Sequence, residues 1–190
     1  TGEEHTRLHR VTEQKSNLGI VAEANELSRR IAQTDLTPNE ALLEIDRLNR
    51  MESSYSPFEE FIAVAFICGF FAILFQGNFN DLIAAAITGS IGYVVYLYSK
   101  KLTNIRFFSE LLGALTIGWI ALFLTNLSIG NDVNIIIVAS IMTLVPGKAI
   151  TNGIRDLMAS HFISGVSVLA DALLTASAIG IGISTVLSFI

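Results

Sequence analysis

Ionisable side chains at the edges of long apolar runs are the residues of this sequence that could do chemistry. They are Asp81, Glu110, Asp132, Lys148, Arg155, Asp156 and Asp171. A charged side chain in hydrocarbon is costly and usually marks a substrate pathway or a proton relay. We take Glu110 and Asp171 as candidate proton-coupling carboxylates, with plain exposure to water as the equally weighted alternative. For Asp81 and Asp132, solvation at the membrane interface is the favoured explanation.

The second candidate is the stretch "LVPGKAITNGIRDL", residues 144–157. Pro146 lacks an N–H group and Gly147 tolerates unusual dihedral angles, so together they can break a helix near membrane depth. A new helix after Gly147 would carry one polar side: Lys148, Thr151, Asn152, Arg155 and Asp156. Its positive N-terminal end could hold a carboxylate, as half-helices of transporters do. The alternative, weighted equally, is an amphipathic helix on the membrane surface.

Motifs of enzymes are absent from the sequence. It contains no phosphate loop, dinucleotide fingerprint or His-Glu-x-x-His pair, so we expect no enzyme activity, no cofactor and no metal. His5 and His9 share a helix face in a polar segment, where exposure to water is favoured over metal binding. His161 is expected at the membrane interface. The single cysteine, Cys68, excludes a disulfide within the chain.

Composition predicts the fold that would position these residues. Of the 190 residues, 52% are hydrophobic and 15% are charged, against about 25% charged in soluble domains. Five apolar segments follow one another: 61–80, 82–99, 111–131, 133–147 and 172–190. A span needs about 20 residues to cross about 30 Å of hydrocarbon. We therefore predict an all-α, polytopic membrane protein with about five transmembrane helices, the fourth being short.

The first 56 residues differ from the rest. Residues 1–60 hold 12 acidic and 7 basic side chains, whereas residues 61–190 are balanced. This acidic excess predicts a cytoplasmic helical segment and no nucleic-acid binding. We expect one helix over 7–33 and another after a capping box at Thr37, Pro38 and Glu40. The predicted boundaries are 1–56 for this segment, as the end of a longer N-terminal region, and 57–190 for the transmembrane domain.

Basic residues in the loops predict the orientation. The connections after the second and fourth apolar segments carry Lys100, Lys101, Arg106, Lys148 and Arg155, and the other two carry none. By the positive-inside rule, the N-terminus is cytoplasmic and the C-terminus lies outside. An odd number of spans leaves room for a second, complementary set of helices.

Small residues are frequent in the apolar segments. Ala176, Gly180 and Ser184 form a small-xxx-small face, and Gly89, Gly92, Gly113 and Gly118 add flat patches. Such faces let helix backbones approach closely in lipid. Packing of the bundle is the favoured interpretation of each.

Residues 144–174 resemble the threonine/serine exporter (ThrE-like) family, and within it the YjjP-type membrane subunits. The shared features are a Pro-Gly, a Thr-Asn pair, an Arg-Asp pair, a Ser-Gly and an acidic residue: Pro146, Gly147, Thr151, Asn152, Arg155, Asp156, Ser164, Gly165 and Asp171. The hairpin at 74–89, with Gly77 and Asp81, is also similar, although Gln76 stands where the family often has a second glycine. "TRLHRV" and "TPNEALLEIDRL" are similar to the family's cytoplasmic lead-in, and the family's further segment before "HRV" is absent here.

The resemblance implies secondary-active export of threonine, serine or related small carboxylates across a bacterial-type inner membrane. Some two-component members are linked to dicarboxylate export. A second membrane half, either a separate small subunit or a second copy, would be the partner besides substrate and the lipid bilayer. The substrate would meet residues 146–156, where Arg155 and Asp156 hold each other or gate the cytoplasmic mouth. The alternative is a non-transporting subunit that scaffolds a partner.

Overall fold

The computed structural model describes residues 18–33, 36–50, 55–103, 105 and 107–189. All regular structure in these ranges is helical, which confirms the predicted all-α class. The chain divides into two compact units, residues 1–56 and 57–190. The expected helix over residues 7–17, together with His5 and His9, lies outside the described residues.

The first unit is a helical hairpin of α1 (Leu18–Ala32) and α2 (Pro38–Asn49). Helix α2 begins at the predicted capping box. The Thr37 N–H donates to Glu40 Oε2 at 2.8 Å, and the Glu40 N–H donates to Thr37 Oγ1 at 3.4 Å. Leu27 and Ala41 are buried between the two helices.

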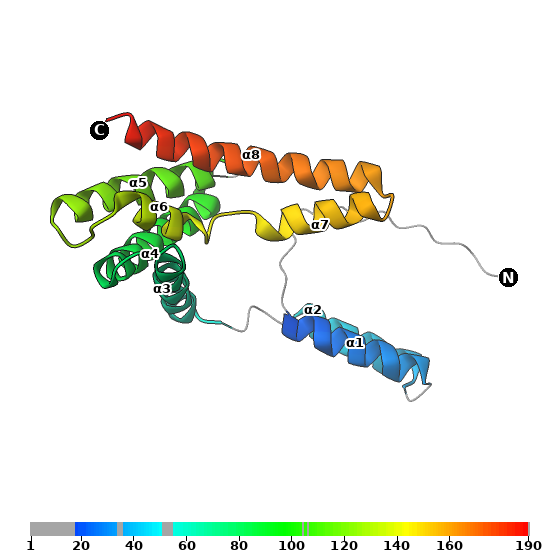
Figure 1. Cartoon of the computed structure of the whole chain (residues 1–190). Coiled ribbons are helices and arrows are strands. Elements are labelled where there is room, and N and C mark those ends of the chain that lie inside the picture. Colours follow the sequence, from blue (N-terminus) through cyan, green and yellow to red (C-terminus); the bar gives the residue numbers. More distant parts are fainter. Residues whose placement is uncertain (1–17, 34–35, 51–54, 104, 106, 190) are drawn as a thin grey trace. The chain divides into compact units, whose positions relative to one another are not determined.

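The second unit contains six helices (Figure 1). They are α3 (Pro57–Leu74), α4 (Phe79–Leu102), α5 (Phe108–Asn126), α6 (Val133–Ile141), α7 (Gly147–Met158) and α8 (Phe162–Leu187). Among the described helices, four are long and apolar enough to cross a membrane, namely α3, α4, α5 and α8. The prediction of about five transmembrane helices therefore agrees approximately with the structure.

The fourth apolar segment differs from the prediction of a full span. Helix α6 has 9 residues and ends at Ile141. At a rise of 1.5 Å per residue it covers about 14 Å, roughly half of the hydrocarbon core. This half-helix lies among α3, α4 and α5, where Ile136, Ala139 and Ser140 are fully buried.

The fifth segment also begins elsewhere than predicted. Asp171 was expected at the start of this segment, but α8 runs without interruption from Phe162 to Leu187. A single carboxylate does not end a helix, and no proline or turn sequence separates residue 162 from residue 172. Asp171 therefore lies well inside a helix.

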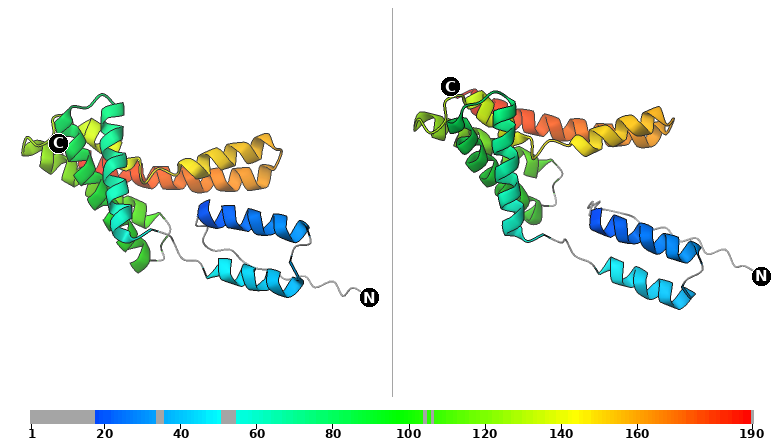
Figure 2. Two further views of the ribbon diagram at one scale, coloured as in Figure 1. Left: turned by 90° about the horizontal axis from the view of Figure 1, so that it is seen from below. Right: turned by 60° about the horizontal axis from the view of Figure 1, so that its bottom comes forward.

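Helices α7 and α8 form a hairpin that projects from the bundle (Figures 1 and 2). The first half of α8 packs on α7 and its second half packs on α5. At the α7–α8 crossing, a Cβ atom on Gly165 would lie 2.9 Å from the Gly153 carbonyl oxygen. The backbones thus touch at these two glycines.

The small-xxx-small face of α8 does not pack against any part of the chain that the structure describes. Ala176, Gly180 and Ser184 are exposed, and a Cβ atom on Gly180 would meet no atom within 4 Å. By contrast, the glycines predicted to form flat patches on α4 and α5 do contact neighbouring helices. A Cβ atom on Gly113 would lie 3.4 Å from the Gly92 oxygen, and one on Gly118 would lie 2.9 Å from a Val186 methyl carbon.

Candidate functional site

The chain breaks its helix between α6 and α7. Helix α6 ends at Ile141, whose carbonyl accepts from the Leu144 N–H at 2.8 Å and from the Val145 N–H at 3.2 Å. Helix α7 starts at Gly147, directly after Pro146. The predicted break is therefore present, and it begins five residues before Pro146.

This break lies beside the interior of its neighbouring helices. The Ser140 hydroxyl donates to the Ala85 carbonyl of α4 at 3.2 Å. Leu144, in the turn itself, has a methyl carbon 3.1 Å from where a Cβ atom on Gly113 of α5 would lie. Ala85 and Gly113 are both more than one turn inside their helices. The end of α6 and the turn at Leu144 thus lie inside the apolar bundle, whereas the start of α7 at Gly147 is exposed.

The candidate substrate residues gather on one side of α7. Lys148, Thr151, Asn152 and Arg155 are exposed there, whereas Gly153 on the opposite side is buried against α8. A Cβ atom on Gly147 would meet nothing within 4 Å, so the start of α7 is open. The structure therefore presents these side chains without enclosing them.

Asp156 takes part in the α7–α8 hairpin. Its carboxylate accepts from the Ser164 hydroxyl at 2.8 Å, and its backbone carbonyl accepts from the His161 N–H at 2.8 Å. In the described part of the chain no ion pair joins Asp156 to Arg155. The first role of Asp156 is thus to close the turn between the two helices.

The two proton-coupling candidates lie on different helices. Glu110 is in the first turn of α5 and is half-buried. Asp171 is half-buried in α8, between the part that packs on α7 and the part that packs on α5.

Asp81 holds two hairpins together at the other end of the bundle. Its carboxylate accepts from the Asn131 N–H at 2.6 Å, the Asp132 N–H at 3.0 Å and the Asn78 N–H at 2.9 Å. With 1% of its surface exposed, solvation by water is the wrong explanation for this residue. Asp132 is exposed and caps α6, accepting from the Asn134 N–H at 2.8 Å.

Gly77 belongs to the same end. A Cβ atom there would lie 2.9 Å from both the Ala72 carbonyl oxygen and an Ile135 methyl carbon. Gly77 and Asp81 therefore fix the packing of the first hairpin against the start of α6, and neither lies near residues 146–156.

A cluster of small polar groups at the end of α6 was missed from the sequence. The Ser140 carbonyl accepts from the Thr143 hydroxyl at 3.2 Å and from the Cys68 thiol at 3.8 Å. On α4, the Thr88 hydroxyl is completely buried and has no hydrogen-bond partner in the described structure. The sequence does not indicate this cluster, because single serine, threonine and cysteine residues are common in apolar helices whether or not they contact one another.

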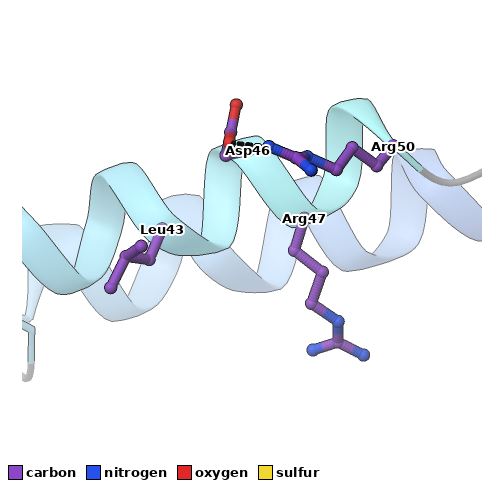
Figure 3. A pocket seen from close by; sticks show the side chains of 4 residues that line it. All are labelled: Leu43, Asp46, Arg47 and Arg50. Carbon is purple, nitrogen blue, oxygen red and sulfur yellow. Dashed lines mark hydrogen bonds and ion pairs between the residues drawn. The ribbon is translucent and has the colours of Figure 1, made fainter.

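The hollows on the surface are unrelated to these residues. One, of about 540 Å³, lies over α2 beside Leu43, Asp46, Arg47 and Arg50 (Figure 3). There Arg50 pairs with Asp46 at 3.0 Å while Arg47 points away. The other, of about 390 Å³, is an apolar groove between α3 and α4, lined by Phe66, Phe70 and Leu82 among others. Among the described residues, no group of three His, Cys, Asp or Glu could hold a metal ion.

Long apolar helices, a half-helix and a backbone break inside the bundle define a multi-pass helical membrane protein. The family model described as "Putative threonine/serine exporter" (ThrE) matches residues 1–190, the whole chain. The protein belongs to this family. No curated protein and no solved structure is similar enough to match it.

Proposed function

We propose that the protein exports threonine, serine or related small carboxylates across a bacterial-type inner membrane by secondary-active transport. The observation that carries the proposal is the α6–α7 break inside the bundle of a ThrE family member. Irregular backbone at membrane depth is tolerated only where it is buried in protein or lines a water-filled cavity. Transporters use such breaks to bind their substrates.

The substrate carboxylate would bind at the start of α7. The region around Gly147 is open, and the Lys148 and Ala149 N–H groups donate to no carbonyl in the described structure. These groups, the helix dipole and the Lys148 ammonium favour an anion. Asn152, one turn further and exposed, would supply a polar contact.

Proton coupling would use Glu110 or Asp171. Both are half-buried carboxylates in apolar helices, and such groups commonly form proton relays. Asp171 is the stronger candidate, because it lies in the same α7–α8 hairpin as the substrate residues.

A second membrane half would complete the site. The polar side of α7 and the small-residue face of α8 are both exposed within this chain. Exposed polar side chains at membrane depth require a protein or water-filled surrounding. Either a separate small subunit or a second copy would provide it, and the N-terminus would be cytoplasmic with the C-terminus outside.

The test is an export assay on Asn152→Ala and Asp171→Asn at matched expression. Asn152→Ala should lower export by weakening substrate binding, and Asp171→Asn should abolish its dependence on the proton gradient. Ser177→Ala, an exposed change on α8 away from the break, serves as the control. Unchanged export in both variants would refute the assignment.

A second candidate function is a scaffold subunit that does not transport. The observation in its favour is that Lys148, Thr151, Asn152 and Arg155 of α7 are all exposed in the described structure. Reconstitution of the chain with and without its partner separates the two. Transport by the partner alone would favour the scaffold.

A further inference from the structure

We propose that the end of α6, together with the Thr88 hydroxyl, binds the ammonium group of a zwitterionic amino acid. This inference rests on the proposed export function and narrows its substrate class. It predicts that small carboxylates without an amine, dicarboxylates included, are poor substrates.

The first observation is a set of unpaired carbonyls at the break. In the described part of the chain, the carbonyl oxygens of Met142, Thr143 and Leu144 accept no hydrogen bond. Helix α7 starts too late to use them, since the Gly147 N–H donates to Val145 and the Ile150 N–H to Pro146. Carbonyls at a helix C-terminus carry a partial negative charge. In transporters, unwound carbonyls and half-helix C-terminal ends coordinate cations.

The second observation is the buried hydroxyl of Thr88. Several other hydroxyls in the apolar helices donate to the carbonyl four residues earlier, as Ser90 does at 2.7 Å and Thr116 at 2.8 Å. Thr88 has 0% of its surface exposed and no partner in the described structure. Leaving a buried hydroxyl unpaired costs about 1–3 kcal/mol, so it calls for an explanation.

Thr88 lies on the turn of α4 that packs against the last turn of α6. Ala85, one turn earlier, accepts from the Ser140 hydroxyl. Gly89, the next residue, would carry a Cβ atom 3.4 Å from Ser140 Cα. The unpaired hydroxyl and the unpaired carbonyls thus belong to one region of the bundle.

The chemistry of the two sides of the break is opposite. The α6 side offers carbonyl and hydroxyl oxygens, which accept from the three N–H groups of an ammonium. The α7 side offers free N–H groups and Lys148, which suit a carboxylate. An α-amino acid has one group for each side, whereas a dicarboxylate would place a second negative charge against carbonyl oxygens.

The test compares Thr88→Val with Thr116→Val in an export assay, using serine as the probe. Valine preserves the shape of threonine and removes the hydroxyl. Because a hydrogen bond to an ammonium is lost, the KM for serine should rise roughly tenfold to a hundredfold in Thr88→Val. Thermal stability should be unchanged or higher, since an unpaired hydroxyl is removed. Thr116→Val, whose hydroxyl already has a partner on its own helix, should leave the KM unchanged.

Competition experiments complete the test. Threonine should inhibit serine export, whereas succinate and glycerate, in which a hydroxyl group replaces the amine of serine, should not. Equal inhibition by glycerate or succinate, or an unchanged KM in Thr88→Val, overturns the inference and leaves the export function standing. If neither serine nor threonine is exported, this inference fails, and the proposed function fails with it only if no related small carboxylate is exported either.

Discussion

Asp81 joins parts of the chain that are far apart in sequence. Its carboxylate receives N–H groups from its own helix start and from residues 50 and 51 positions later. A carboxylate with several backbone donors is among the stronger polar contacts in a protein. This residue therefore stabilises the bundle, and its effect on transport should be indirect.

Asp81→Asn should lower the stability of the protein by about 2–3 kcal/mol, because an amide has one acceptor oxygen where the carboxylate has two, and at least one backbone N–H group loses its partner. Thermal unfolding in detergent measures this. Asp132→Asn is the comparison, with a smaller loss expected at its exposed cap. A full loss of export in folded, stable Asp81→Asn would contradict the structural role.

Glu40 gives the N-terminal unit a defined response to pH. Hydrogen bonds from the backbone and side chain of Thr37 lower the pKa of Glu40 below its ordinary value of 4.5. Since the pKa is lower in the folded state, this stabilisation is present above pH 4.5 and is lost as pH falls through the folded pKa. The protection factors of the amides in the first turn of α2, corrected for the intrinsic exchange rate at each pH, should therefore fall at acidic pH. Glu40→Gln, which has no titrating carboxylate, should remove that pH dependence, and an unaltered dependence in this variant would exclude the capping box as its cause.

Residues with local partners were predictable and those with distant partners were not. Thr37 and Glu40 are three positions apart, so the sequence alone defines their contact. The partners of Asp81 depend on how α4 and α6 pack, and its position at a segment end suggested contact with water. Gln76 was predicted to differ from the family only in the geometry of the turn. It adopts a left-handed φ of 64°, the conformation that a glycine favours, so the turn forms with glutamine at this position.

At the scale of helices, the apolar segments predicted the elements but not their ends or contacts. The break at Pro146 and Gly147 was predictable, whereas the early end of α6 was not, because 133–147 has no charge and no proline or glycine before Pro146. Small-residue spacing shows that a helix can be approached closely. It does not show which neighbour approaches, and within this chain Gly153 and Gly165 make the contact instead of Gly180.

Gly165→Ala and Gly180→Ala should have opposite effects on the same helix. The new methyl at position 165 would press on the Gly153 carbonyl and destabilise the hairpin by about 1–3 kcal/mol. At position 180 the methyl meets open space, so the higher helix propensity of alanine should make the change neutral or stabilising by up to about 1 kcal/mol. Thermal unfolding of the isolated chain in detergent compares them.

The same pair tests for a partner. If a second membrane half packs on the small-residue face of α8, Gly180→Ala should destabilise the complex while leaving the isolated chain intact. If Gly180→Ala changes the stability of the isolated chain and of the complex by the same amount, this face is in contact with lipid.

At the scale of the whole molecule, the orientation is a prediction that labelling can check. Cys68 is the single cysteine and is fully buried, so Cys68→Ala provides a cysteine-free background. In that background, a cysteine replacing Ser128 should react with a membrane-impermeant reagent from outside. One replacing Ser160 should react only after the membrane is opened. Both residues are exposed in loops, and the reverse pattern would invert the topology.

The contacts of Asp81 also bear on how the protein is made. Asn131 leaves the ribosome 50 residues after Asp81, a delay of roughly 3–10 seconds at ordinary rates of synthesis. During this interval the first hairpin has only the local Asn78 N–H for a carboxylate that is later buried. We therefore expect Asp81 to stay in contact with water during insertion, and the hairpin to reach its final depth only after the α5–α6 connection has been made.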